Sequence, residues 1–234
     1  MGFGRIVKRM LPDRPVRLRV WRGPMRGAQV MMNPRCSLRK IFGLYEHELN
    51  GWLEATLRKV DRVIDVGAND GYFTFGCAAA FRRLRKQGEI LAFEPQERHF
   101  LELQQSALRQ PAGSPRISIK QCFVGNKLDT DITTLDAVRW HAENESKRAG
   151  TLIKIDVEGA ELGVLDGGRS WLSSSNWFLI EVHKREFLQE ITRMFAAKNL
   201  VLDLVEQRPL PVVGREQRDE DNWWLVSRLS SPGQ

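Results

Sequence analysis

Short apolar runs alternate with longer segments of helical periodicity through most of this chain of 234 residues. Runs of Val, Ile, Leu and Phe predict buried strands, and apolar residues spaced three or four positions apart predict the helices between them. The predicted strands are 62–66, 90–94, 117–124, 151–157, 177–182, 200–205 and 222–228, and the predicted helices are 44–60, 71–86, 96–109, 139–148, 160–172 and 185–198. This alternation favours an α/β fold in which helices cover both faces of a mostly parallel sheet.

The last two predicted strands are joined by a Pro- and charge-rich connection that contains no helix. Parallel neighbours need a long crossover connection, so a link of this kind indicates an antiparallel strand. We therefore expect a seven-stranded, mostly parallel sheet with one antiparallel strand near its end. This Rossmann-like architecture matches class I methyltransferases better than dinucleotide-dependent dehydrogenases.

The segment before this core has a different pattern. Residues 16–21 and 28–32 alternate between apolar and polar positions around a turn that contains Gly and Pro, which predicts a small hairpin. We expect residues 1–60 to form a basic arm, this hairpin and a helix, packed on a core domain of residues 61–229.

A glycine-rich turn follows the first strand of the predicted core. The sequence there is VIDVGANDG, so the strand ends near Asp65 and the turn holds Gly67 and Gly71. Glycine lets the backbone approach a ligand closely. The turn lacks the GxGxxG pattern that binds the pyrophosphate of a dinucleotide. S-adenosylmethionine carries no phosphate, and we expect Asp65 to accept a hydrogen bond from its amino group. The residues expected to face the methionyl part are Gly67, Ala68, Asn69 and Gly71.

The next strand ends in a carboxylate, Glu94, which lies 23 residues after Gly71 and is followed by Pro95. A carboxylate in this position can accept hydrogen bonds from the hydroxyls of a ribose. Alternatively, Glu94 caps the following helix, because negative charge is favourable near a helix N-terminus. Together the turn and Glu94 indicate a nucleoside-containing cofactor at the carboxyl edge of a parallel sheet.

Ionisable residues interrupt two later strands. Lys154, Asp156 and Glu158 alternate with Ile and Val, so they share one face of their strand. The following strand places Glu181 and His183 on one face in the same way. Buried charges are unfavourable unless they are paired. These groups therefore either neutralise one another or line a water-filled site where ligands bind in open α/β sheets.

Positive charge is concentrated near the N-terminus. The formal net charge is +7, and residues 1–40 hold eleven Lys and Arg against a single acid, Asp13. This arm suits a solvated surface, an anionic substrate or a lipid headgroup surface, whereas nothing in the pattern indicates nucleic acid. Three separated cysteines fit a reduced, intracellular protein, and no apolar stretch approaches the ~20 residues of a membrane span. We expect a cytoplasmic location, with peripheral contact between the arm and the inner face of the membrane.

Six segments together resemble the FkbM family of S-adenosylmethionine-dependent methyltransferases. They are GLYEHEL at 43–49, VIDVGANDGYFT at 63–74, AFEP at 92–95, TTLD at 133–136, LIKIDVEGAELGVLDGG at 152–168 and IEVH at 180–183. The resemblance implies a class I fold, S-adenosylmethionine as the cofactor, and methyl transfer to a hydroxyl of a sugar, lipid-linked glycan or polyketide. The basic arm and the adenine contacts have no counterpart in the pattern.

The resemblance also assigns residues to the cofactor. The contacts that it carries over are Asp65, Gly67, Asn69, Gly71 and Glu94, and the prediction adds Ala68, Pro95 and Asp156. Tyr45 and Glu46, from the first matching segment, are expected to close over the cofactor.

An alcohol must lose its proton to become a good nucleophile, so a positioned base should accelerate methyl transfer by roughly 10²–10⁴-fold. His183 is the first candidate base because imidazole titrates near neutral pH; a purely structural strand-end histidine is the alternative. Asp156 is the second candidate base, or an orienting group. Lys154 either takes part in catalysis or forms a structural ion pair with Glu181. Asp156 and Glu181 could also hold Mg²⁺, although the prediction assigns no metal.

Other functions fit parts of the same pattern. They are N-methylation of an amine or peptide, S-adenosylmethionine binding without catalysis, and an NAD-dependent oxidoreductase, which the missing third glycine disfavours. The expected partner is a small-molecule or lipid-linked hydroxyl compound and not a nucleic acid.

Overall fold

The computed structural model describes residues 11–140, 150–210 and 222–229. Seven of the strands are β3 (Val60–Val66), β4 (Glu89–Phe93), β5 (Arg116–Lys120), β8 (Gly150–Ile155), β9 (Trp177–Val182), β10 (Leu202–Val205) and β11 (Trp223–Ser227). They form one sheet in the order β10-β11-β9-β8-β3-β4-β5. Strands β5, β4, β3, β8 and β9 run parallel, and β11 is antiparallel to both β9 and β10. The predicted sheet with one reversed strand is confirmed.

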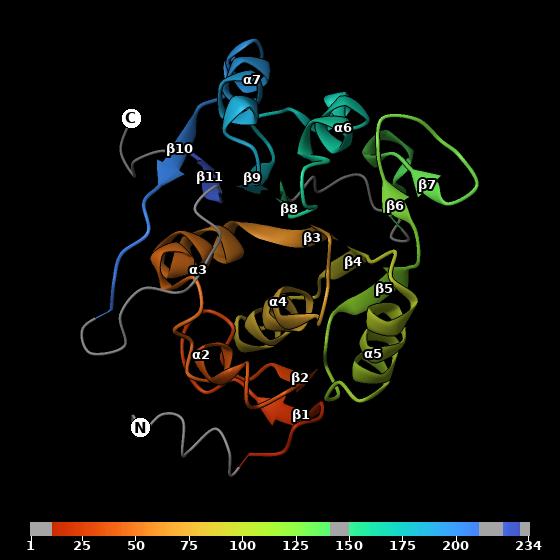
Figure 1. The fold of residues 1–234 in the computed structure, drawn as a ribbon, viewed down its shortest axis with the longest axis vertical. Coiled ribbons are helices and arrows are strands. Elements are labelled where there is room, and N and C mark those ends of the chain that lie inside the picture. Colours follow the sequence, from red (N-terminus) through yellow and green to blue (C-terminus); the bar gives the residue numbers. More distant parts are fainter. Residues whose placement is uncertain (1–10, 141–149, 211–221, 230–234) are drawn as a thin grey trace.

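Helices pack on both faces of this sheet (Figure 1). They are α3 (Asn50–Lys59), α4 (Tyr72–Arg83) and α5 (Glu97–Leu108) on one face, and α6 (Glu161–Asp166) and α7 (Arg185–Ala196) on the other. Alternate residues of β3 serve the two faces, because Val63 packs in the core beneath α4 and Ile64 in the core beneath α7. Burying both faces explains why the central strands are nearly continuous apolar runs.

The predicted hairpin is present as β1 (Val16–Arg19) and β2 (Gln29–Met32), which pair antiparallel. It is followed by α2 (Leu38–Ile41) and lies on the α4 side of the sheet (Figure 1). Met25, in the hairpin loop, is buried against Gly76 of α4, where an added Cβ would lie 2.3 Å from the Met25 sulfur. At the opposite end of the chain, Ser227 of β11 accepts a hydrogen bond at its carbonyl from Trp52 Nε1 of α3 at 2.8 Å. The N-terminal segment therefore contacts the core at two places, α4 and β11.

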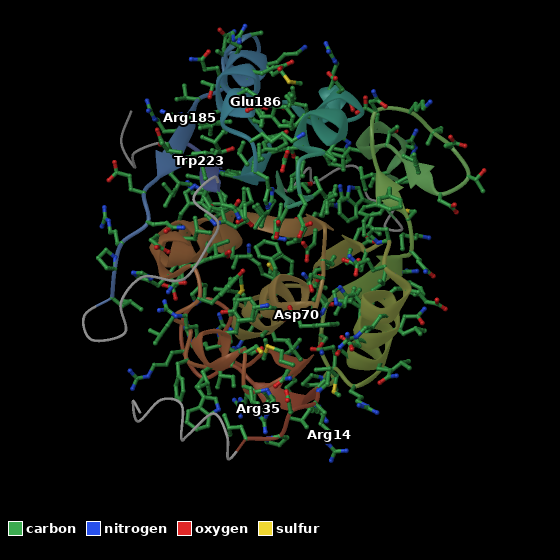
Figure 2. The ribbon with its side chains drawn as sticks, in the orientation of Figure 1. Arg14, Arg35, Asp70, Arg185, Glu186 and Trp223 are labelled. Atoms are coloured by element: carbon green, nitrogen blue, oxygen red, sulfur yellow. The ribbon has the colours of Figure 1, made fainter. Side chains whose placement is uncertain are left out.

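Charged side chains lie at both ends of the molecule, with Arg185 and Glu186 on α7 (Figure 2). Arg14 and Arg35 lie at the hairpin end of the molecule, whereas Asp70 lies near the start of α4 (Figure 2). The first ten residues, which include part of the predicted basic arm, lie outside the described residues. Within the described ranges, no helix combines the length and the apolar character that crossing a bilayer requires.

Some predicted boundaries were wrong. The strand predicted at 117–124 is two strands, because after β5 the chain leaves the sheet and β6 (Phe123–Val124) pairs with β7 (Ile132–Thr133). The helix predicted at 160–172 ends at Asp166, where Gly167 packs so closely on the Gly125 carbonyl that a Cβ would lie 1.9 Å from its oxygen. The helix predicted at 139–148 lies almost wholly outside the described residues.

The helix predicted at 44–60 begins later than expected. A 3₁₀ turn, η1 (His47–Leu49), precedes α3. Glu46 has the left-handed backbone angle φ of +47°, which interrupts helical geometry before that turn. The segment before this turn is therefore not helical, and it forms one wall of the candidate active site.

Candidate active site

The turn after β3 has the backbone geometry that its glycines predict. Gly67 has φ of +79°, and a Cβ on it would lie 1.9 Å from the carbonyl oxygen of Asp156. Gly71 has φ of +82° and directly precedes α4. Asn69, between them, also has a positive φ of +48°. Only a residue without a side chain fits at Gly67, so the tips of β3 and β8 can lie in direct backbone contact.

Glu94 fixes this turn from the neighbouring strand. Its two carboxylate oxygens accept from the backbone N–H of Asn69 at 2.7 Å and of Gln96 at 2.9 Å, and only 4% of the residue is exposed. The bond to Gln96, the residue before α5, is the kind of contact expected of the capping alternative. Because a carboxylate offers about four acceptor sites, both oxygens keep acceptor capacity. Contact of Glu94 and Pro95 with a ribose stays a prediction.

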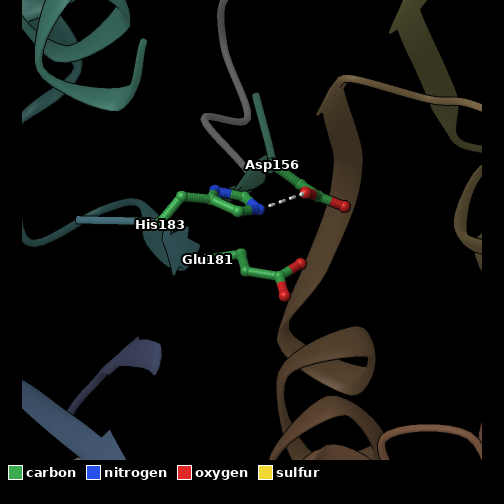
Figure 3. A group of neighbouring side chains, drawn as sticks. All are labelled: Asp156, Glu181 and His183. Carbon is green, nitrogen blue, oxygen red and sulfur yellow. Dashed lines mark ion pairs between the residues drawn. The ribbon is translucent and has the colours of Figure 1, made fainter. Parts of the chain in front are cut away.

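Asp156, Glu181 and His183 meet where β8 and β9 end (Figure 3). His183 Nε2 lies 3.8 Å from Asp156 Oδ1, and Glu181 accepts from Asn222 Nδ2 at 3.1 Å. Burial, the charges of Asp156 and Glu46, and a hydrogen bond with Asp156 together raise the pKa of Glu181 to about 9. Glu181 is therefore protonated at neutral pH and donates its proton to a hydrogen bond with Asp156.

A residue that the sequence analysis did not assign, Glu161, orients His183. Glu161 is fully buried at the start of α6, and its Oε1 lies 2.6 Å from His183 Nδ1. The same oxygen accepts from the backbone N–H of Gly159 at 3.0 Å. The hydrogen bond to Glu161 raises the pKa of His183 above its usual value. With Nδ1 held in this way, Nε2 is the nitrogen directed toward Asp156.

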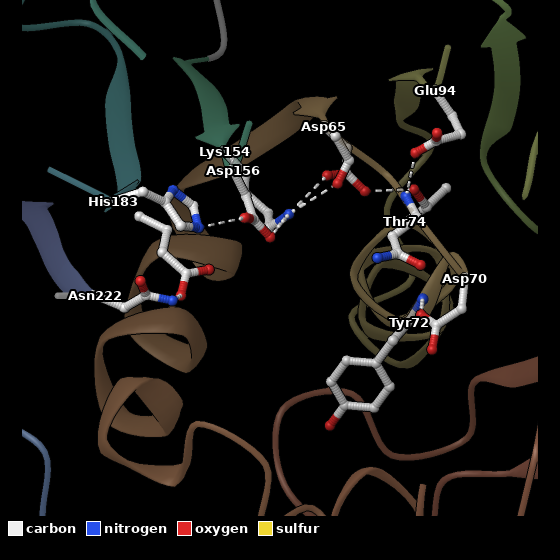
Figure 4. A network of polar contacts seen from close by, with 12 residues as sticks. Asp65, Asp70, Tyr72, Thr74, Glu94, Lys154, Asp156, His183 and Asn222 are labelled. Carbon is white, nitrogen blue, oxygen red and sulfur yellow. Dashed lines mark hydrogen bonds and ion pairs between the residues drawn. The ribbon is translucent and has the colours of Figure 1, made fainter. Parts of the chain in front are cut away.

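Lys154 lies at the centre of a wider polar network (Figure 4). Its Nζ is 2.9 Å from Asp156 Oδ2 and 3.4 Å from Asp65 Oδ1, and it donates to the Gly67 carbonyl at 3.2 Å. The structural pair predicted between Lys154 and Glu181 is wrong, because β8 and β9 align Lys154 with Leu179 and Lys154 Nζ pairs with Asp156 and Asp65.

Lys154 and the two carboxylates beside it shift one another's pKa values. Burial would lower the pKa of Lys154, but the carboxylates of Asp156 and Asp65 outweigh burial and raise it. Lys154 in turn keeps the pKa of Asp156 below its usual value despite burial. Burial raises the pKa of Asp65, which is fully buried and accepts from Thr74 Oγ1 at 2.5 Å. Lys154 is a permanent cation that positions two carboxylates, and this leaves it unsuited to accept a proton.

A cavity opens between the turn after β3 and the N-terminal segment. Tyr45 and Glu46 line it together with Lys154 and Asp156, and closure of Tyr45 and Glu46 over the cofactor stays a prediction. The turn contributes Gly67, Ala68 and Asn69. The other predicted cofactor contacts, Asp65, Gly71, Glu94 and Pro95, lie outside this lining.

Two aromatic rings and an ion pair join the walls of the cavity. Lys40 Nζ lies 2.5 Å from Asp70 Oδ2, and 5.0 and 5.5 Å from the ring centres of Tyr45 and Tyr72. The two tyrosine rings meet edge to face at 5.7 Å. Asp70 and Tyr72 stand inside the matching segment VIDVGANDGYFT at 63–74, whereas no sequence signal identified Lys40.

Within the described residues, one group of carboxylate and imidazole side chains could hold a metal ion. The ligand atoms of Asp156, Glu181 and His183 lie within 4.8 Å of one another. Each is already engaged: Asp156 by Lys154, Glu181 by its own proton and Asn222, and His183 by Glu161. The prediction that no metal is resident stays a prediction.

Comparison with known proteins finds similarity to methyltransferases. A model of the methyltransferase FkbM domain matches residues 109–202. The hexuronic acid methyltransferase AglP of Haloferax volcanii is 26% identical over 180 residues, which cover 68% of this chain and 72% of that protein. The crystal structure of methyltransferase FkbM from Methylobacillus flagellatus superposes with a TM-score of 0.57 at 20% identity. The superposition covers 73% of this chain but only 44% of that structure.

The strand order, the reversed β11 and this superposition define a class I methyltransferase fold. The matched domain model and AglP are both methyltransferases, and this chain is similar to both. The FkbM methyltransferase domain model matches part of the chain, and the predicted resemblance to that family is confirmed. The matched range contains Lys154, Asp156, Glu161 and His183 and does not reach the glycine turn.

Proposed function

We propose that this chain transfers a methyl group from S-adenosylmethionine to a hydroxyl of a sugar or a lipid-linked glycan. The observation that carries the proposal is one cavity bounded by the glycine turn, by Tyr45 and Glu46, and by Asp156, with the Glu161–His183 pair beside Asp156. The similarity to a hexuronic acid methyltransferase supports a sugar as the acceptor.

The residues at the strand tips fit the cofactor. Asp65 Oδ1 is buried 3.4 Å from Lys154 Nζ and keeps acceptor capacity, which suits the cofactor's amino group. Because Gly67 has no Cβ, the backbone carbonyl of Asp156 can occupy the space that a side chain would otherwise fill. Asp156 stays ionised and Glu46 lines the same cavity, which favours a positively charged ligand.

When bound, S-adenosylmethionine supplies an electrophilic methyl group on its sulfonium. His183 Nε2 accepts the proton of the acceptor hydroxyl as the oxygen attacks, and Glu161 keeps the imidazole in the required orientation. Asp156, 3.8 Å from Nε2, stabilises the imidazolium that results. Lys154 holds Asp156 in place and neutralises part of its charge. Alignment of the acceptor within a cavity of this kind supplies much of the remaining acceleration.

Calorimetric titration with S-adenosylhomocysteine and with NAD tests the first half of the proposal. We expect saturable binding of S-adenosylhomocysteine, no binding of NAD, and an affinity at least tenfold lower in Asp65→Asn. Asp166→Asn, an exposed aspartate on α6, is the matched control and should bind as the parent chain does. Binding of NAD alone would contradict the proposal.

Transfer of an isotope-labelled methyl group to a panel of acceptors tests the second half. The panel contains uronic-acid oligosaccharides, neutral oligosaccharides, lipid-linked glycans and amines. We expect label in an ether linkage on a sugar. Label on nitrogen would replace the proposal with N-methylation, and binding of S-adenosylhomocysteine without transfer to any acceptor would count against catalysis of this class.

A further inference from the structure

Two large aromatic side chains lie exposed beside each other on the N-terminal segment. Trp21 is 65% exposed and Phe42 is 41% exposed, and their rings meet edge to face at 5.7 Å. The backbone holds both loops in place, since Trp21 N–H donates to the Ile41 carbonyl at 2.8 Å. At Gly43 a Cβ would lie 2.3 Å from the Arg22 carbonyl oxygen, so the loops are in direct contact. The aromatic pair is therefore a fixed surface feature and not a side chain displaced from the core.

The same region is strongly basic. Residues 14–45 contain eight Arg and Lys and no Asp or Glu. A pocket beside Trp21 is lined by Arg19, Arg26, Arg82 and Arg83, and none of its lining residues is acidic. Burial and the charge of Arg26 lower the pKa of Arg83 to about 10, and burial and Arg19 lower the pKa of Arg82. Like charges are thus gathered here with few acids to balance them.

Part of this cluster has a structural role. Arg82 donates to the Gly27 carbonyl at 3.3 Å, and Arg83 donates to the carbonyls of Pro24 and Arg26, which fixes the hairpin loop on α4. Carbonyl partners carry no net charge, so they leave the positive charge of both guanidinium groups uncompensated. The one ion pair made here by a lining arginine within the described residues joins Arg26 to Glu54 at 3.1 Å.

The basic pocket adjoins the candidate active site. The hairpin loop separates the two, because Pro24 and Met25 line the candidate active-site cavity and Arg26 and Gly27 line the arginine pocket. Phe42 stands three residues before Tyr45 of that cavity. A surface bound at the aromatic pair would therefore lie close to the residues that line the candidate active-site cavity.

We propose that Trp21, Phe42, Arg19 and Arg22 form a docking patch for a membrane surface that contains anionic phospholipids. Trp and other aromatic residues are favourable at the depth of lipid headgroups. Each arginine near an anionic lipid surface strengthens binding by about fivefold. Docking here would bring the cavity to a membrane, where lipid-linked acceptors reside. Vesicle binding at this patch does not depend on the proposed methyl transfer.

Co-sedimentation of the full chain with phosphatidylcholine vesicles, with and without phosphatidylglycerol, tests the patch. We expect binding at least tenfold tighter with phosphatidylglycerol, and weaker binding as salt rises. The double variants Arg19→Glu/Arg22→Glu and Trp21→Ser/Phe42→Ser should each lose at least tenfold in affinity. The matched controls are Arg98→Glu/Arg193→Glu, exposed arginines on α5 and α7, and Leu108→Ser, an 88% exposed leucine. These controls should bind vesicles as the parent chain does.

Titration with S-adenosylhomocysteine is run on every variant. Unchanged cofactor binding with lost vesicle binding supports the patch and shows that the variants are folded. Equal vesicle binding by the parent chain and both patch variants would overturn the patch. So would absence of vesicle binding, or patch-dependent binding of inorganic phosphate or single-stranded RNA without vesicle binding. Vesicle binding without any S-adenosylhomocysteine binding would instead overturn the proposed function alone.

Discussion

At the scale of single residues, His183 and Glu161 determine how activity should depend on pH. A general base must be unprotonated, and the hydrogen bond that His183 donates to Glu161 raises the pKa of His183. We therefore expect kcat/KM to rise with pH through a pKa above 6.5, the usual value for His183. His183→Ala should remove this limb and lower kcat by about 10²–10⁴-fold. The profile of kcat/KM against pH measures whether the limb is lost. Titration with S-adenosylhomocysteine checks that the cofactor affinity is unchanged.

Glu161→Gln distinguishes orientation from simple structural support. The variant removes a negative charge beside His183, so the pKa of His183 falls and the rising limb of the profile moves to lower pH. A merely structural role for Glu161 would change the amplitude of the profile and leave its midpoint in place. His99→Ala, on α5 outside the site, is the control and should reproduce the parent profile.

Glu181 gives a second residue-scale prediction, in stability. Native Glu181 keeps its proton up to a pKa of about 9, whereas the unfolded chain releases it near the usual value of 4.5. The native state therefore binds more protons between these values, and its stability falls as pH rises across this window. Glu181→Gln stays neutral and can still accept from Asn222 and donate to Asp156. The free energy of unfolding of Glu181→Gln, relative to the parent chain, should rise by at most about 1.4 kcal/mol for each pH unit.

Urea denaturation between pH 5 and 9 measures this difference. Glu186→Gln, an exposed change on α7, is the control, and its free energy of unfolding should depend on pH as that of the parent chain does. If Glu181→Gln also follows the parent chain in this way, Glu181 is ionised in the native state, and its assigned hydrogen bond to Asp156 is wrong.

The sequence could predict which ionisable side chains lie at the strand ends. It could not predict which side chains they pair with. Period two placed Lys154 and Asp156 on one face, and both lie at the site. Period two does not reveal the register between strands, and the register decides that Lys154 pairs with Asp65 across β3 and not with Glu181. Glu161 was missed because its role depends on how α6 is seated against β9, which no local pattern records.

At the scale of elements, the contact between the β3 turn and β8 makes Gly67 a sharp test. Gly67→Ala combines left-handed strain with a Cβ 1.9 Å from the Asp156 carbonyl oxygen. We expect a loss of about 2–5 kcal/mol of stability, together with loss of S-adenosylhomocysteine binding. Urea denaturation and calorimetry measure the two effects.

Gly113→Ala is the matched control for this change. Gly113 has φ of +76°, almost the same as Gly67, but a Cβ there would meet nothing within 4 Å. It should lose only the ~1–2 kcal/mol of left-handed strain and keep full cofactor binding. Equal effects at both glycines would show that backbone strain, and not the contact between β3 and β8, matters.

Periodicity could predict whether each element is a helix or a strand. Contacts between residues that are distant in sequence determine where several of these elements end. The strand at 177–182 was predicted with its observed bounds because an apolar run buried on both faces is a strong local signal. The break after β5 arises because Phe123 pairs with Ile132, and the end of α6 arises where Gly167 meets Gly125. These contacts join residues that are distant in sequence, so no window of a few residues contains them.

At the scale of the whole molecule, the boundary predicted near residue 60 separates segments that share one core. Val20 and Val30 of the N-terminal segment are fully buried in the same apolar cluster as Phe75 and Phe81 of α4. A cluster continuous across the boundary should fold and unfold as one unit. The hydrophobic pattern could predict that the hairpin exists, but it could not show which surface buries it.

Met25→Ala tests this continuity. Met25 is 2% exposed, packs on Gly76 of α4 and also lines the candidate active-site cavity. Its truncation should lower the free energy of unfolding by about 2–5 kcal/mol, whereas Met31→Ala, on the half-buried side of β2, should lower it by less than about 1 kcal/mol. Because the cluster is shared, the loss should shift one cooperative urea transition, with far-UV circular dichroism and tryptophan fluorescence coinciding. A separate early transition in Met25→Ala would mean that the N-terminal segment unfolds as an independent unit, and the cavity wall formed by Tyr45 and Glu46 could then open without unfolding the sheet.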